Sequence, residues 1–483
     1  MLNLRKVIQT IESEDAQKLI FWLKQRDADK CVQLFNLLRD ESIDELNVAD
    51  ELGLRPSGYY SLKSRLYASI QEFMSHGIPE SDIDLLRSIS GIPHLLFDTP
   101  RELAIAQLLK MEKDLKEHDM PYALTIVYNA LKKLNRFSKK YFDYTQLYNK
   151  HVAYTIALDK TQELLSDFNK SLGEFLMSRD EKHYNVLLLI KDEMYNYAQL
   201  YTSHRLTVYK NIMDVEFLLF TPTTENIVNN EVFEILGKIE KVITDFKSDA
   251  NYSFLFTLLD FLWFEYYNKN KSLDNADKYF LKTNKKLPNF LLYNFCSVPT
   301  LFLISKAERY LEKRQEQELY EESMFLSSDY TPDKEDIPNY INYVKFKAIA
   351  FFYVQKYNEC ISILNELIGS ISFRNFQYAE IEMKLFLAIC YLMVNKSELT
   401  DGIVKNVKRK LREYPVNEYE NARIFTKILS GVTGPTEKER EEKVLNLTKR
   451  FLVLNHSEFR MLDYIRFNKD IIKILTERDK VVL

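Results

Sequence analysis

The chain has 483 residues, of which 46% are hydrophobic and 28% charged, and its formal net charge is −4. This length suggests roughly three domain-sized units or one extended array. The hydrophobic content is high enough to form a folded core, so we exclude a mainly disordered chain. Only 10 Gly and 12 Pro occur, too few for turn-rich β folds or glycine-cradled nucleotide sites, so we predict an all-α protein.

The first predicted domain, residues 1–98, consists of short helices and ends at a break rich in Gly and Pro. Its first residues reach acidic side chains before any long apolar run, so we do not expect a signal peptide. No apolar stretch of the sequence approaches the ~20 residues that cross a bilayer. We therefore expect a cytoplasmic protein without a membrane span.

Residues 47–73 of this domain resemble a helix-turn-helix. Ala49 takes the place of the small residue in the first helix, Gly53 that of the turn, and Leu54 that of the apolar residue after it. The second helix then has an apolar stripe of Leu62, Leu66, Ile70 and Phe73. In DNA-binding proteins of this class the second helix enters the major groove. The resemblance therefore implies candidate nucleic-acid contacts at Lys63, Ser64 and Arg65.

The charge of this region argues against DNA binding. Residues 1–90 contain 11 Lys and Arg against 15 Asp and Glu, whereas a DNA-binding surface needs several phosphate contacts. The same helical pattern also occurs in interaction or dimerisation domains and in purely structural helical domains. We favour an interaction domain and keep plain packing and DNA contact as the alternatives.

Residues 99–220 form the second predicted domain, which we expect to consist of long-helix hairpins. It opens on Thr99-Pro100-Arg101-Glu102, where Thr, Pro and Glu occupy the positions they favour at a helix start. Apolar residues then recur at helical spacing, as in Leu187, Ile190, Met194, Tyr197 and Leu200. A second break at residues 221–224 separates this domain from the third, residues 221–483.

The third predicted domain contains an internal repeat. A shift of 40 residues pairs Phe346 with Phe386 and Ile349 with Ile389. The same shift pairs further buried-face positions: Val354 with Val394, Ile363 with Ile403, Leu364 with Val404, and Leu367 with Val407. This pattern predicts two successive helix-turn-helix units with matching buried faces.

A third unit upstream resembles the tetratricopeptide repeat (TPR). Tyr267 matches the aromatic residue near the end of the first TPR helix, Ala276 the small residue of the second helix, Phe280 the aromatic one turn later, and Pro288 the terminating proline. In the unit around Tyr357, similar places are taken by Ala348, Cys360 and Leu364. The resemblance implies a TPR-like α-solenoid over residues 221–483, whose stacked hairpins form a groove for a peptide or a partner helix.

A basic cluster lies in the last predicted helix of this repeat: Lys405, Lys408, Arg409, Lys410 and Arg412. Such a cluster can bind an acidic peptide, RNA or a membrane surface. The alternative is a solvated face near a helix C-terminus, where positive charge is favoured by the helix dipole. The sequence leaves both interpretations open.

Catalytic and metal-binding motifs are absent from the sequence. Its seven His are scattered without HxxxH or HExxH spacing, and no GxGxxG, GxxxxGK[ST] or GxSxG occurs. For the most notable lone histidine, His204, we favour a partly buried structural role. We therefore predict no catalytic, metal or cofactor-binding residues and no cofactor.

The predicted function is a non-enzymatic scaffold or adaptor with a protein or peptide partner. The alternative is a DNA-binding transcriptional regulator that joins the N-terminal helix-turn-helix to a TPR-like sensor region. Several bacterial regulators that combine such modules look similar in outline. Local charge around Lys63 and Arg65 distinguishes the two, because a regulator must present a basic face there.

Overall fold

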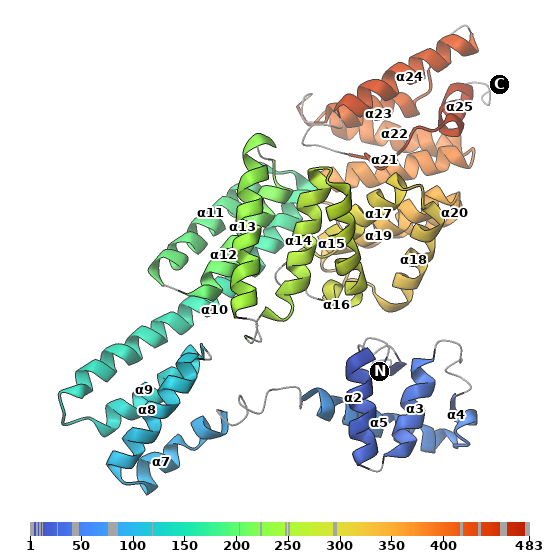
Figure 1. Cartoon of the computed structure of the whole chain (residues 1–483). Helices are drawn as coiled ribbons and strands as arrows, with labels where there is room; N and C mark the ends of the chain where they lie inside the picture. The colour runs from blue at the N-terminus through green and yellow to red at the C-terminus, as the bar shows by residue number, and fades with distance from the viewer. Residues whose placement is uncertain are drawn as a thin grey trace. The chain divides into compact units, whose positions relative to one another are not determined.

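The structure is a computed structural model of the chain. It describes all residues except 1–3, 6–7, 9–10, 12, 27, 41–47, 76–85, 118, 202, 223–224, 247–248, 250–251, 293–296, 416–418, 433–435, 455–460 and 479–483. Across the described residues every regular element is an α-helix and no strand occurs, which confirms the all-α prediction (Figure 1). No helix in the described part of the chain is long and apolar enough to cross a membrane.

The chain divides into two compact units, Met1–Asp159 and Lys160–Leu483. The division falls inside one helix, α10 (Lys140–Ser178). The predicted domain boundaries after residues 98 and 220 stay predictions. Helix α8 does begin at Arg101, two residues after the predicted helix-start signal at Thr99.

The first unit contains two separate apolar clusters. One is built from α2 (Ser13–Gln25), α3 (Asp29–Arg39) and α5 (Pro56–Ser75), with α4 (Val48–Glu51) beside α3. The other is built from α7 (Ile92–Asp98), α8 (Arg101–Glu117), α9 (Pro121–Leu134) and the start of α10. Each cluster forms because apolar residues recur at helical spacing and bury one face of each helix.

The second unit is a succession of antiparallel helices that share one continuous apolar core. Its helices after α10 are α11 (Glu181–Leu200), α12 (His204–Phe220), α13 (Glu225–Asp245), α14 (Leu255–Lys269), α15 (Leu273–Lys285), α16 (Leu287–Leu292), α17 (Leu301–Glu312), α18 (Glu316–Asp329), α19 (Ile337–Tyr353), α20 (Tyr357–Ser370), α21 (Gln377–Met393), α22 (Ser397–Leu411), α23 (Glu420–Leu429), α24 (Glu437–Leu454) and α25 (Lys469–Glu477). Consecutive helices pack against each other from α17 to α25, and α17, α19, α21 and α23 also contact one another in turn. Figure 1 shows these helices lying side by side.

Four helix pairs in this unit are joined by the same tight turn. In each turn the N–H that follows the turn donates to the carbonyl five residues earlier, as from Lys356 to Phe351 and from Lys396 to Tyr391, both at 2.9 Å. One residue in each turn has a left-handed backbone: Lys271 (φ 54°), Arg314 (φ 56°), Gln355 (φ 62°) and Asn395 (φ 59°). This is the Schellman ending of a helix, in which glycine is the usual left-handed residue.

A glycine at this turn is expected to stabilise the second unit. A residue with a side chain loses about 1–2 kcal/mol of stability in the left-handed region, and glycine removes this loss. Part of the gain is offset because glycine is more flexible in the unfolded chain. Gln355→Gly should therefore raise the free energy of unfolding by about 0.5–1 kcal/mol, measured by urea denaturation followed by circular dichroism. Gln355→Ala is the control and should bring no gain, whereas a glycine variant less stable than the wild type would contradict the expectation.

One contact between neighbouring helices recurs after 40 residues in α19–α22. The sulfur of Cys360 lies 3.4 Å from the carbonyl oxygen of Ala348, and the hydroxyl of Thr400 lies 3.2 Å from the carbonyl oxygen of Ala388. All four side chains are fully buried. A small residue is needed on the first helix of each pair because the second helix crosses its backbone at that point.

The cysteines among the described residues are buried free thiols. Cys31, Cys360 and Cys390 are all buried, while Cys296 lies outside the described residues. At the start of α24 the Thr436 hydroxyl accepts from the N–H of Glu439 at 3.3 Å. The glycine and proline that precede it, Gly434 and Pro435, lie outside the described residues.

Candidate functional site

Helix α22 has two faces of opposite character. Its apolar face buries Thr400, Val404, Val407 and Leu411, which recur every three or four residues and pack into the core of the second unit. Because this spacing follows the turn of an α-helix, the residues between them are left on the solvent side. Four of the residues left outside are the cations Lys405, Lys408, Arg409 and Arg412, all exposed.

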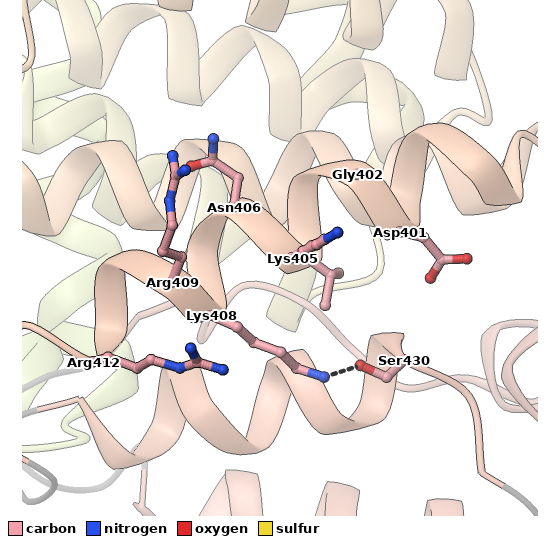
Figure 2. Close-up of a pocket in the computed structure, with 9 residues that line it drawn as sticks. Asp401, Gly402, Lys405, Asn406, Lys408, Arg409, Arg412 and Ser430 are labelled. Atoms are coloured by element: carbon pink, nitrogen blue, oxygen red, sulfur yellow. Dashed lines mark hydrogen bonds between the residues drawn. The ribbon is translucent and has the colours of Figure 1, made fainter.

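These four cations line a cavity of about 650 Å³ between α22 and the end of α23. The remaining lining residues are Asp401, Gly402, Val404, Asn406 and Ser430. We call this cavity the cationic groove. Figure 2 shows Lys408 reaching across it to Ser430, whose hydroxyl oxygen lies 2.6 Å from the lysine nitrogen. The four cations run along roughly 10 Å of the helix, since each residue advances it by about 1.5 Å.

The cations of the cationic groove have little negative charge beside them. Within the described part of the chain, Lys405, Arg409 and Arg412 have no carboxylate within ion-pair distance. Asp401 is the one acidic residue of the lining, and it accepts a charged hydrogen bond from the buried Arg478. The groove therefore presents a concentration of positive charge that the described residues leave largely unneutralised.

The fifth residue of the predicted basic cluster, Lys410, does not line the cationic groove. Its ammonium group pairs with Glu380 of α21, which also pairs with Lys384. These two lysines hold the pKa of Glu380 below its usual value, against the opposing effect of burial. Lys410 therefore helps to hold α22 against α21. The structure brings the other four of the five predicted cations together in the cationic groove.

The C-terminal end of α22 is capped by another side chain. The guanidinium of Arg423, on α23, donates to the carbonyl oxygens of Leu411, Tyr414 and Pro415. Such contacts satisfy carbonyls that the helix itself leaves unbonded at its end. The capping thus comes from Arg423, and Lys405, Arg409 and Arg412 remain directed to solvent.

The residues that complete the cationic groove could not be identified from the sequence. Ser430 lies 22 residues from Lys408 and has no local pattern that links it to the basic cluster. Gly402 has no side chain to fill the groove, and a Cβ added there would meet no atom within 4 Å. A glycine inside a helix lowers the stability of the helix by about 1 kcal/mol relative to alanine. The presence of Gly402 was therefore the one feature of the sequence that pointed to a groove on this helix.

The N-terminal residues proposed for nucleic-acid contact lie on α5. Ser64 and Arg65 are exposed, and Lys63 is half-buried with its ammonium group 5.7 Å from the centre of the Tyr59 ring. Leu62, Leu66 and Ile70 form the predicted buried stripe. Phe73 packs against it and contacts Trp22 with ring centroids 5.9 Å apart. Gly53 has the left-handed turn conformation, with φ 63°, while Asn47 lies outside the described residues.

The residues proposed for repeat packing are mostly buried. Ala276, Phe280, Ala348, Cys360 and Leu364 all lie in the core of the second unit. Tyr267 is half-buried, and its ring stacks against those of Trp263 and Tyr279, with centroids 5.5 Å and 5.7 Å away. Pro288 is exposed and follows the end of α15 by three residues, a usual place for a proline after a helix.

His204 has the structural surroundings expected of it. Its ring stacks on Phe246 with centroids 3.9 Å apart, and its Nδ1 lies 2.5 Å from the hydroxyl of Tyr252. Among the described residues no group of three or more His, Cys, Asp or Glu side chains could hold a metal ion.

No protein-family model, no curated protein and no solved structure matches this chain.

Proposed function

We propose that this protein is a non-enzymatic interaction scaffold that binds an acidic peptide or partner helix in the cationic groove. The observation that carries the proposal is the row of four cations along α22 and at its C-terminal cap, three of which have no carboxylate partner among the described residues. A protein ligand fits this arrangement because a helix displays acidic side chains at the same intervals of three and four residues. Charge complementarity of this kind gives specificity and fast association.

The helical pairs around the groove support a TPR-like repeat scaffold. The left-handed turn residues at 271, 314, 355 and 395 recur at intervals of about 40 residues. Each pair cannot bury its apolar face alone, so stacking of neighbouring pairs produces the continuous core. Such a stack holds α22 rigidly against α21 and α23 and so fixes the spacing of its cations.

An acidic helical peptide is expected to bind the cationic groove. The probe is a fluorescein-labelled, alanine-based peptide of about 16 residues, long enough to form a helix, with glutamates at positions i, i+3, i+4 and i+7. Fluorescence anisotropy should show saturable binding that weakens as salt rises, because salt screens exposed charges. Lys405→Glu/Arg409→Glu should weaken binding by about 2 kcal/mol, or roughly 30-fold in Kd.

The control is Lys427→Glu/Lys449→Glu, which changes the net charge equally at exposed lysines outside the lining. It should leave the affinity for the peptide unchanged. Equal losses in both double variants would show that only net charge matters and would contradict a site at the cationic groove. Duplex DNA of mixed sequence serves as the competitor: displacement of the peptide by DNA at moderate salt would favour a nucleic-acid ligand instead.

A further inference from the structure

Residues 461–466 are part of the connection between α24 and α25. They lie across α17, α19 and α21, which are the first helices of three successive helix pairs. They contact α17, α19 and α21 through the residues Leu311, Tyr353, Lys345, Glu382 and Phe386. Residues 461–464 form a turn, and no part of the segment is helical. We call residues 461–466 the inserted segment. Its Met461, Leu462, Tyr464 and Ile465 side chains are buried in the core of the second unit. Unlike the helices, it also hydrogen-bonds through its main chain to side chains of its neighbours.

Side chains of α19 and α21 bind the main chain of the inserted segment. The hydroxyl of Tyr353 donates to the carbonyl oxygen of Tyr464 at 2.5 Å and accepts from the N–H of Arg466 at 3.0 Å. The carboxylate of Glu382 accepts from the N–H of Leu462 at 3.2 Å. Side chains that hydrogen-bond to a non-helical main chain are a means of recognising a peptide, because they satisfy backbone groups that no helix or sheet pairs.

Two side chains of the inserted segment occupy defined places on this surface. The Tyr464 ring contacts Phe386 edge-on, with centroids 5.1 Å apart, and the ammonium group of Lys345 lies 4.9 Å from its centre. The guanidinium of Arg466 donates to the carbonyl oxygen of Leu311 at the end of α17. Tyr464 and Arg466, two positions apart in the sequence, therefore both contact the helices beneath the inserted segment.

The inserted segment is not ideally matched to its place. Leu462 has a left-handed backbone, with φ 61°, a conformation that is unfavourable for residues other than glycine. The buried hydroxyl of Tyr464 has no hydrogen-bond partner within the described residues, which also weakens the contact. Both features lower the affinity of the segment for the surface.

We propose that the inserted segment is an intramolecular ligand, and that a partner peptide containing an aromatic–aliphatic–arginine sequence replaces it on α17, α19 and α21. This surface is distinct from the cationic groove on α22, so the proposal goes beyond the proposed function. A tethered ligand acts at an effective concentration on the order of millimolar. It therefore keeps the surface occupied until a tighter peptide competes.

The test uses the full chain and a labelled peptide with the sequence of residues 461–467, Met-Leu-Asp-Tyr-Ile-Arg-Phe. In the chain variant Tyr464→Ala/Arg466→Ala the inserted segment loses its aromatic contact with Phe386 and its guanidinium contact with Leu311. We expect this variant to bind the peptide at least tenfold more tightly than the wild type does, by fluorescence anisotropy. A peptide with alanine in place of its tyrosine should not bind. Adding Tyr353→Phe to the variant should weaken binding at least fivefold, because the ring stays and the bridging hydroxyl is lost.

A variant that keeps its helical circular dichroism and its cooperative unfolding but does not bind the peptide would overturn the proposal. Hydrogen exchange of the wild type gives a second test that needs no substitution. The amides of Leu462 and Arg466 should exchange at least tenfold faster than those in the middle of α21, since an intramolecular ligand opens locally. Equal exchange rates would show that the segment does not open separately from the helices and would also overturn the proposal. Lys405→Glu/Arg409→Glu should leave peptide binding unchanged, so a failure here is distinguishable from a failure at the cationic groove.

Discussion

An arginine in place of Ala348 is expected to destabilise the second unit by about 4 kcal/mol or more, or to prevent it from folding. The Ala348 side chain is fully buried, and its carbonyl oxygen lies 3.4 Å from the sulfur of Cys360 on the next helix. A long side chain here forces α19 and α20 apart and buries a charge without a partner. Urea denaturation followed by circular dichroism measures the loss, and Ala348→Leu should cost less, about 1–3 kcal/mol.

The same substitution at Ala388 tests whether the two helix pairs are equivalent. Ala388 is fully buried and its carbonyl oxygen contacts Thr400 in the same way, so Ala388→Arg should cause a similar loss. Asn358→Arg, at an exposed position of α20, is the control and should change stability by less than about 0.5 kcal/mol. Wild-type stability in Ala348→Arg would show that the two helices do not depend on a small residue at this contact.

Glutamine in place of Glu265 is expected to stabilise the protein by about 3 kcal/mol at pH 8 and to have little effect near pH 4. Glu265 lies on α14 and is fully enclosed, and one of its carboxyl oxygens has no hydrogen-bond partner among the described residues. Burial raises its pKa from 4.5 to about 7, although a hydrogen bond with Ser305 and the charge of Lys269 act in the opposite direction. A shift of this size corresponds to about 3 kcal/mol because one pKa unit is about 1.4 kcal/mol.

The direction of the pH dependence follows from where the proton is held. Between pH 4.5 and about 7 the folded protein keeps a proton on Glu265 that the unfolded chain releases, so wild-type stability falls as the pH rises through this window. Above it both states are ionised, and the full penalty for the buried charge remains. Glutamine does not titrate in this range. Urea denaturation should therefore show that the free energy of unfolding of Glu265→Gln falls less than that of the wild type between pH 5 and pH 8.

Two other residues serve to separate this effect from general changes in charge. Glu231→Gln, at an exposed site of α13, should match the wild type at both ends of the pH range. Glu216 of α12 is also fully buried, and burial raises its pKa well above the usual value, so part of the wild-type pH dependence should persist in Glu265→Gln. Identical pH profiles for Glu265→Gln and wild type would contradict a buried, protonated Glu265.

The helical nature of the chain could be predicted from the sequence, whereas the residues at its left-handed turns could not. Low glycine and proline content favours long helices, and the matching spacing around Phe346 and Phe386 falls on two helices, α19 and α21. The four left-handed turn residues are Lys, Arg, Gln and Asn. They could not be identified in advance, because three of them lack the usual preference for this conformation and are held in it by the hydrogen bonds of the turn.

The sequence by itself determined which residues are cationic and which face of α22 is apolar, because both follow from residue type and the period of a helix. Only the tertiary structure decided what each cation does: it paired Lys410 with Glu380, placed Lys408 beside Ser430 and left Lys405, Arg409 and Arg412 facing the cavity. The contact of residues 461–466 with α17, α19 and α21 was likewise a tertiary outcome. Arg466 meets Leu311 across 155 positions of the chain, and a pairing at that separation depends on how the intervening helices stack.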